Sequence, residues 1–199
     1  MAVVEALTVL AATLMLAVSL GYPTLWFVVP FAVISLGGRR YEDYGLQRGR
    51  PGGVAFHAAV IGLVLGGYAL GHYLFARLLL GQTFTATLPD AFARTLLEQV
   101  LVVGLSEEFF FRGYLQSQLN RQFGRPWRFL GAPFGWGLVL AAVLFGLCHL
   151  VTGPPTQLKV IFFGLFAGWL RERTETIYVP AVYHGVSNCL YFFMAASME

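Results

Sequence analysis

Long apolar stretches without a charged side chain constrain this chain more than any other feature. Four stretches contain no Asp, Glu, Lys or Arg: 6–38, 51–76, 129–158 and 176–198. A helix that crosses a bilayer needs about 20 mostly apolar residues, so each stretch is long enough to supply at least one. Charged residues make up 12% of the chain, about half the share that covers a water-facing surface. The sequence therefore predicts an integral membrane protein.

Helix breakers divide these stretches into individual helices. Gly21-Tyr22-Pro23 separates two helices in the first stretch, and Thr152-Gly153-Pro154-Pro155 ends the helix in the third. No Lys or Arg precedes the first apolar run, so it lacks the basic region of a signal peptide and is interpreted as a retained helix. The segment 91–120 carries charges, but apolar residues recur through it without proline. We expect seven helices near 4–20, 24–37, 54–80, 91–120, 134–151, 158–170 and 178–197.

These helices predict an all-α fold, a polytopic membrane helix bundle forming a single transmembrane domain over residues 1–199. Positive charge indicates its orientation, because Lys and Arg favour cytoplasmic loops. The interhelical clusters are Arg39, Arg40, Arg48 and Arg50; Arg121, Arg125 and Arg128; and Arg171 and Arg173. All fall on one side of a seven-helix model, whereas 81–90 and 152–157 contain no Lys or Arg. We expect a multi-pass protein of the cell (inner) membrane with a cytoplasmic N-terminus, an external C-terminus, the lipid bilayer around it and no nucleic-acid partner.

Three polar patterns interrupt the apolar helices. The fourth helix contains Glu107-Glu108-x-x-x-Arg112, the fifth ends at His149, and the seventh contains His184-x-x-x-Asn188. Ionisable side chains are costly at membrane depth and usually face a bundle interior or a water-filled cavity. The patterns therefore predict a recessed polar cavity between helices 4, 5 and 7.

Helical geometry separates the two glutamates. Glu108 and Arg112 are four residues apart, so they share a face and are expected to form a supporting ion pair. Glu107 is rotated by about 100° and must find its partners on other helices. His184 and Asn188 are also four residues apart, and they present an imidazole and an amide side by side.

A carboxylate, two imidazoles and an amide can split a peptide bond with water. The carboxylate takes a proton from water, and N–H groups stabilise the oxyanion that develops. The same residue types also suit a metal ion such as zinc, with Glu107, His149 and His184 as ligands. Residue chemistry leaves both mechanisms open. Four other side chains are interpreted as lying outside the site: His57, His72, Cys148 and Cys189.

The three patterns, E-E-x-x-x-R, F-x-x-x-H and H-x-x-x-N, occur in order on successive helices, with Arg112-Gly113-Tyr114-Leu115 closing the first. This set resembles the CPBP family of intramembrane peptidases, which includes CAAX prenyl endopeptidases of the Rce type and bacterial Abi-like proteins. The matched region covers roughly residues 100–195. The resemblance implies a glutamate-dependent endopeptidase in which Glu107 activates water and His149 helps to position it. His184 and Asn188 would stabilise the oxyanion, supported by Glu108 and Arg112.

The resemblance also implies a substrate class and an open question about cofactors. The substrate is expected to be a membrane-anchored protein or peptide, with a C-terminal sorting or anchor tail favoured by likeness to the compact relatives called myxosortases. The glutamate mechanism requires no cofactor, but the family has also been described as metal-dependent, so zinc is the alternative. A non-catalytic membrane transporter or a bacteriocin-immunity or binding protein is the rival function. Transporters also bury ionisable residues, but they often carry inverted repeats, and none is found in this sequence.

Residue counting raises a question of depth. At about 1.5 Å per residue, Glu107 and His149 fall near mid-membrane, whereas His184 falls nearer the cytoplasmic surface. The three side chains can meet if the 152–157 loop dips into the bundle or if the last helix starts deeper.

Overall fold

The computed structural model describes residues 2–199 as seven helices joined by short connections, and 76% of these residues are helical. The first two helices are α1 (Ala2–Leu20) and α2 (Leu25–Leu36). The third is continuous through α3 (Val54–Val60), η2 (Ile61–Leu65) and α4 (Gly66–Leu79). The fourth is continuous through α5 (Phe92–Glu98), η3 (Gln99–Gly104), α6 (Leu105–Glu108), η4 (Phe109–Leu115) and α7 (Gln116–Phe123). The last three are α8 (Trp136–Thr152), α9 (Val160–Thr174) and α10 (Tyr178–Ser197).

All seven predicted helices are present, and the all-α prediction is confirmed. The largest difference lies at the end of α9, which was expected near residue 170 and extends to Thr174. Two short helices, η1 (Tyr41–Tyr44) and η5 (Pro155–Lys159), lie in the connections. A small antiparallel hairpin of β1 (Trp127–Phe129) and β2 (Ala132–Phe134) was not predicted.

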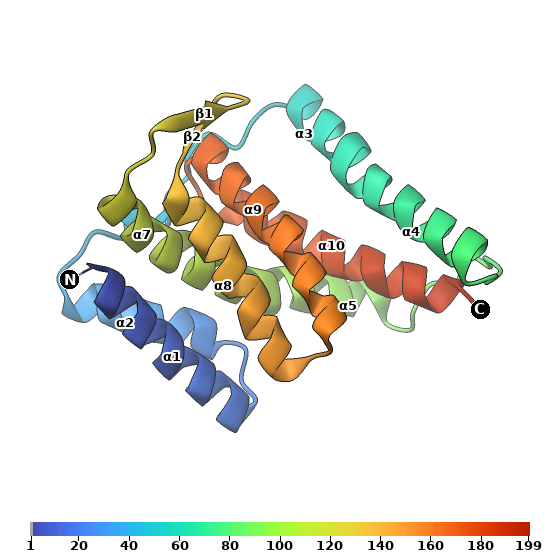
Figure 1. The fold of residues 1–199 in the computed structure, drawn as a ribbon, viewed down its shortest axis with the longest axis horizontal. Helices are drawn as coiled ribbons and strands as arrows, with labels where there is room; N and C mark the ends of the chain where they lie inside the picture. The colour runs from blue at the N-terminus through green and yellow to red at the C-terminus, as the bar shows by residue number, and fades with distance from the viewer. Residues whose placement is uncertain (1) are drawn as a thin grey trace.

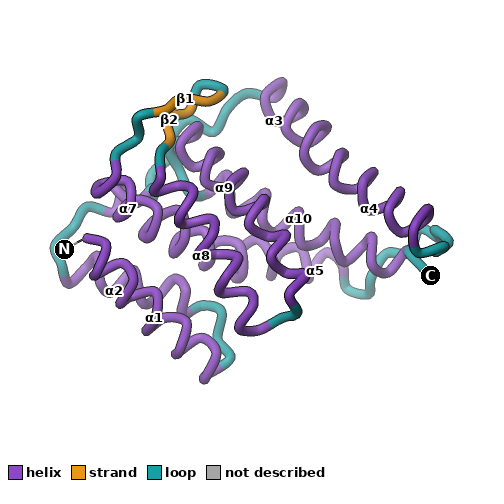
Figure 2. The backbone as a smooth tube through the Cα atoms, viewed as in Figure 1, coloured by secondary structure: helices purple, strands orange, loops and turns teal. Residues whose placement is uncertain are grey.

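The helices are arranged as a central group with one flanking layer on each side (Figure 1). The long helix α5–α7 packs with α8, α9 and α10 in the centre. The α1–α2 hairpin covers one side, where α1 contacts α7, and the helix α3–α4 lies on the other side beside α10. Figure 2 shows that the connecting loops and the hairpin gather mainly at the two ends of the helices.

The outward surface of this bundle is apolar. Two helices, Ala2–Leu20 and Val54–Leu79, are long and apolar enough to cross a membrane. Large exposed apolar side chains are found on several helices, among them Met15, Leu36, Leu63, Leu78 and Phe162. Soluble monomers rarely expose extended apolar patches, because such surface is costly in water. Lipid chains are therefore the natural solvent for this surface.

The aromatic run Phe109-Phe110-Phe111 anchors the fourth helix in the core. All three rings are buried, with exposed fractions of 0%, 0% and 1%. Trp26 of α2 packs edge-on against Phe110 with ring centroids 4.8 Å apart, and Phe27 lies 4.6 Å from Phe109. Since these rings follow Glu107 and Glu108 directly, their packing fixes the position of both carboxylates.

Two glycines let α10 approach the fourth helix closely. A Cβ on Gly185 would lie 2.6 Å from the backbone nitrogen of Val100, and one on Gly104 would lie 2.6 Å from the carbonyl oxygen of Ala181. No real side chain tolerates such contacts, so glycine is required at both positions for this spacing. The close approach brings His184, the neighbour of Gly185, against the helix that carries the glutamates.

The depth of α10 answers the question raised by residue counting. Glu107 lies about 24 Å from the end of α7, and His184 about 9 Å from the start of α10. The turn between α9 and α10 therefore begins about 15 Å inside the end of α7. This turn packs at the level of Gly113 on the fourth helix, because a Cβ on Gly113 would contact Ile177. The last helix therefore starts deeper in the bundle than residue counting assumed. This is one of the two explanations given above for how the three side chains can meet.

The connection between the second and third helices fills the space beneath this raised turn. The backbone of Gly45 accepts a 3.1 Å hydrogen bond from the amide of Ile177. Gln47 donates to the carbonyl of Glu175, and the Arg50 amide donates to the carbonyl of Thr174. These bonds satisfy backbone groups that the short turn would otherwise leave unpaired.

Candidate active site

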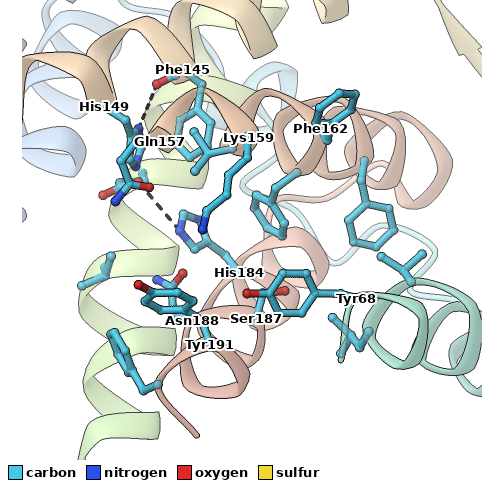
Figure 3. Close-up of a pocket in the computed structure, with 18 residues that line it drawn as sticks. Tyr68, Phe145, His149, Gln157, Lys159, Phe162, His184, Ser187, Asn188 and Tyr191 are labelled. Atoms are coloured by element: carbon cyan, nitrogen blue, oxygen red, sulfur yellow. Dashed lines mark hydrogen bonds and ion pairs between the residues drawn. The ribbon is translucent and has the colours of Figure 1, made fainter. Parts of the chain in front are cut away.

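A cavity of about 700 Å³ opens between the central helices and the third helix. Glu107, His149, His184 and Asn188 all line it, from α6, α8 and α10, and Figure 3 shows the last three on its wall. The predicted cavity between helices 4, 5 and 7 is thus present. Two further helices complete it, with the remaining apolar wall formed mainly by Val64, Leu65, Val160, Phe162, Phe163 and Phe166.

Glu108, Arg112 and His184 form a buried chain of charge-assisted contacts. Arg112 donates from an Nη atom to Glu108 Oε1 over 2.9 Å, and both side chains are almost fully buried, at 1% and 0% exposed. His184 Nδ1 lies 2.8 Å from the same oxygen. An ionised carboxylate only accepts hydrogen bonds, so His184 Nδ1 carries the proton and donates. The bond fixes the ring and directs Nε2 away from Glu108.

Glu107 occupies a different environment from its neighbour. Its Oε2 lies 3.8 Å from His184 Nε2, and its side chain is 15% exposed. Within residues 2–199 this buried oxygen has no hydrogen-bond partner. A buried carboxylate oxygen without a protein donor is costly unless water or a ligand occupies the place of one. Glu108 also has one unpartnered oxygen but does not line the cavity, so Glu107 is the carboxylate of the pair that borders it.

His149 is oriented by its own helix. Its Nδ1 donates to the carbonyl oxygen of Phe145, one turn earlier, over 2.9 Å (Figure 3). In a neutral ring this leaves Nε2 as an acceptor. His149 and Glu107 also line a second cavity of about 340 Å³, which lies toward the turn between α1 and α2. The two side chains thus belong to the wall between the cavities.

Asn188 has a partner that the sequence did not suggest. Its Nδ2 donates to Gln99 Oε1 over 2.8 Å, joining α10 to the first residue of η3. Gln99 directly follows Glu98 and precedes an apolar run, and it falls outside the three patterns. Other polar side chains missed by sequence reasoning also line the first cavity: Tyr68, Gln157, Lys159, Ser187 and Tyr191.

The residues expected to lie outside the site have other surroundings. His57 Nδ1 lies 3.0 Å from the hydroxyl of Tyr183, and the His72 ring packs near Tyr68. Cys148 borders the second cavity, and Cys189 is buried. None of these four side chains is among those that line the first cavity.

A metal ion would require the candidate ligands to converge. Across residues 2–199, no group of three or more His, Cys, Asp and Glu side chains is arranged to hold one. The three side chains named above as possible zinc ligands, Glu107, His149 and His184, are therefore not arranged around a common metal position in this structure. Zinc sites in proteins usually draw at least three ligands from side chains.

Comparison with known proteins assigns this chain to a family. The family model described as Type II CAAX prenyl endopeptidase Rce1-like matches residues 89–190, just over half of the chain. The match covers α5 through most of α10, and it includes the six side chains of the three sequence patterns: Glu107, Glu108, Arg112, His149, His184 and Asn188. No curated protein and no solved structure matches the chain. Proteins of this family are membrane proteases that act on membrane-anchored proteins. The chain belongs to the Rce1-like family of type II CAAX prenyl endopeptidases.

Proposed function

We propose that this protein is an intramembrane endopeptidase in which Glu107 activates a water molecule to hydrolyse a peptide bond. The observation that carries the proposal is the contrast between two adjacent carboxylates. Glu108 is engaged by Arg112 and His184, whereas Glu107 faces the cavity with one oxygen unpartnered in the described chain. Glu108 also has one unpartnered oxygen, but it is fully buried and does not line the cavity. A general base must reach the water that it deprotonates, and of the two carboxylates only Glu107 borders the cavity.

The first chemical step is the attack of water on the scissile carbonyl. Water donates one hydrogen to Glu107 and the other to His149 Nε2, which acts as an acceptor. As the water oxygen bonds to the carbonyl carbon, its proton passes to Glu107 and negative charge moves to the carbonyl oxygen. The Asn188 amide stabilises that oxyanion, together with His184 when Nε2 is also protonated.

The second step breaks the peptide bond. The proton held by Glu107 moves to the leaving nitrogen, the carbon–nitrogen bond breaks, and the carbonyl re-forms as a carboxylic acid. Glu108 and Arg112 take no part in the proton transfer. Their role is to hold the His184 ring, because a carboxylate on Nδ1 fixes both the tautomer and the orientation of an imidazole.

This mechanism runs without a resident metal ion. We expect purified protein to keep its activity after treatment with a metal chelator. Loss of activity on chelation, followed by recovery when zinc is added back, would show that the metal-dependent mechanism applies instead.

The proposal includes the placement of the protein in the membrane. The arginines between the helices favour a multi-pass protein of the inner membrane, with the N-terminus cytoplasmic and the C-terminus outside. The substrate is a membrane-associated protein or peptide, and a C-terminal sorting or anchor tail is the favoured target.

The direct test replaces Glu107 by glutamine. Membrane proteomes of cells with Glu107→Gln and with unchanged protein should differ by an unprocessed precursor, while expression and thermal unfolding in detergent stay the same. Glu98→Gln is the matched control, because Glu98 lies on the same helix but is paired with Arg94 on the surface. Normal processing by Glu107→Gln would contradict the proposal.

A further inference from the structure

The first cavity contains a cation that the proposed hydrolysis does not use. Lys159 is the only lysine of the chain, and it stands at the end of η5, directly before α9. Its side chain extends into the cavity that Glu107 also lines (Figure 3). The ammonium nitrogen lies 5.0 Å from the centroid of the Tyr191 ring of α10. An aromatic face attracts a cation and so holds the side chain in this direction.

No carboxylate of the described chain is paired with Lys159. The ion pairs at this cavity join Arg112 and His184 to the two glutamates, and Lys159 belongs to none of them. A lysine near the end of a membrane helix usually extends toward lipid headgroups and water. Lys159 is exposed, and its ammonium group also lies over the Tyr191 ring on the cavity wall, where its positive charge is available to a bound molecule.

The neighbouring groups narrow the chemistry of that molecule. Gln157, from the same short helix, also lines the cavity and can donate from its amide. Apolar side chains, among them Phe162 and Leu65, make up much of the wall of the same cavity. An ammonium and an amide donor beside apolar walls suit an apolar peptide segment that carries a carboxylate.

We propose that Lys159, assisted by Gln157, binds a carboxylate of the peptide substrate and so selects which segments enter the cavity. The inference rests on the proposed peptidase function, because it assigns a subsite within the same cavity. The carboxylate has two sources, the C-terminus of the substrate or an acidic side chain close to the cleaved bond.

A binding experiment on the Glu107→Gln protein tests this subsite without requiring hydrolysis. Full-length Glu107→Gln protein in neutral phosphatidylcholine nanodiscs is titrated with three peptides: N-acetyl-Leu-Val-Phe as the free acid, the same peptide as its C-terminal amide, and the amide of N-acetyl-Leu-Glu-Phe. We expect the free acid to bind at least about tenfold more tightly than its amide, as for a hydrogen bond to a charged group. Higher ionic strength should reduce this ratio, because salt screens exposed charges.

Substitutions at Lys159 then assign the ratio to this side chain. Lys159→Gln on the Glu107→Gln background should bring the acid-to-amide ratio close to one, and Lys159→Arg should keep most of it. If the internal glutamate peptide binds as tightly as the free acid, a side-chain carboxylate satisfies the subsite. If it binds like the plain amide, the subsite reads the C-terminus.

Three results would overturn the inference: no binding of any of the peptides, equal binding of acid and amide, or a ratio that Lys159→Gln leaves unchanged. None of these depends on whether Glu107 is the base. Hydrolysis of a precursor without a ratio that depends on Lys159 would reject the subsite and leave the proposed function standing. An acid-to-amide ratio that depends on Lys159, found without any hydrolysis of a precursor, would support the subsite and reject the proposed function.

Discussion

Two carboxylates of this bundle, the buried Glu172 and the partly buried Glu107, show opposite relations to their surroundings. Glu172 Oε1 accepts hydrogen bonds from Gln116 and Asn120, and its Oε2 accepts one from Arg125, all at 2.8 Å. Glu107 has an unpartnered buried oxygen in the described chain, and His184 Nε2 lies 3.8 Å from it. The fully engaged carboxylate ties α7 to α9. The comparison teaches that a carboxylate with all its acceptor positions filled serves the packing of the helices, whereas an unengaged one beside a cavity can serve chemistry.

Glu108 lies between these extremes and has the deepest burial of the three. One of its oxygens accepts from both Arg112 and His184, and the other has no partner within residues 2–199. We therefore expect substitutions around Glu108 to alter stability and activity together. Around Glu172 they should alter stability alone, and around Glu107 activity alone.

The largest expected effect follows removal of the cation beside Glu108. Arg112→Met leaves a buried carboxylate without its compensating charge, which costs about 3–5 kcal/mol of stability. Denaturant titration in detergent should show this loss, and the fraction that remains folded should be inactive. Arg94→Met is the matched control, because Arg94 and Glu98 have the same spacing and a 2.8 Å contact but are exposed. An equal loss of stability in both variants would show that burial does not distinguish the two pairs.

The next effect concerns the amide beside the proposed oxyanion. Asn188→Ala should lower kcat about 100-fold, as expected when one donor to an oxyanion is removed. Thermal unfolding should change little, because Asn188 is only partly buried and has Gln99 as its partner. A drop in stability with kcat unchanged would place Asn188 with Glu172 among the structural groups.

A smaller effect is expected at the fully engaged carboxylate. Glu172→Gln keeps an oxygen for Gln116 and Asn120 but loses the charged bond to Arg125, which is half exposed. Stability should fall by about 1–2 kcal/mol. Activity per folded molecule should be unchanged in the precursor assay. Abolished activity in a folded Glu172→Gln protein would break the distinction between engaged and unengaged carboxylates.

The smallest effect should come from the group behind Asn188. Gln99→Ala removes the acceptor that orients the Asn188 amide, so kcat should fall about 2- to 10-fold at unchanged KM. Asn188→Ala combined with Gln99→Ala should be no slower than Asn188→Ala alone, because Gln99 acts through that amide. An additive loss would mean that Gln99 has a separate role.

The helices and four polar residues of the cavity could be predicted from the sequence because their signals are local. Apolar length defines a helix such as α10, predicted and observed at the same residues, 178–197. Likewise, a residue such as Glu107 stands out in an apolar segment wherever that segment packs. The roles of Glu107, His149, His184 and Asn188 stay predictions that the experiments above test.

The remaining features depend on contacts between distant segments and have no local signal. The fourth helix widens to π-helical hydrogen bonding over Gln99–Gly104 and Phe109–Leu115, on both sides of the glutamates. π-Helical segments occur often at functional sites, but no sequence pattern announces them. The pairing of Gln99 with Asn188 likewise depends on the close approach that Gly104 and Gly185 permit.

The short length of α9 has a consequence for the lipid around the protein. Its 15 residues are about 22 Å long, whereas the hydrocarbon core of a typical bilayer is about 30 Å thick. A bilayer meets such a short helix by becoming thinner beside it, at a modest cost per ångström. Phe162, on the cavity wall, is exposed on this helix, so lipid that thins beside α9 would border the cavity. A membrane-anchored substrate approaching there would have its headgroup boundary, and with it water, drawn toward the depth of the glutamates.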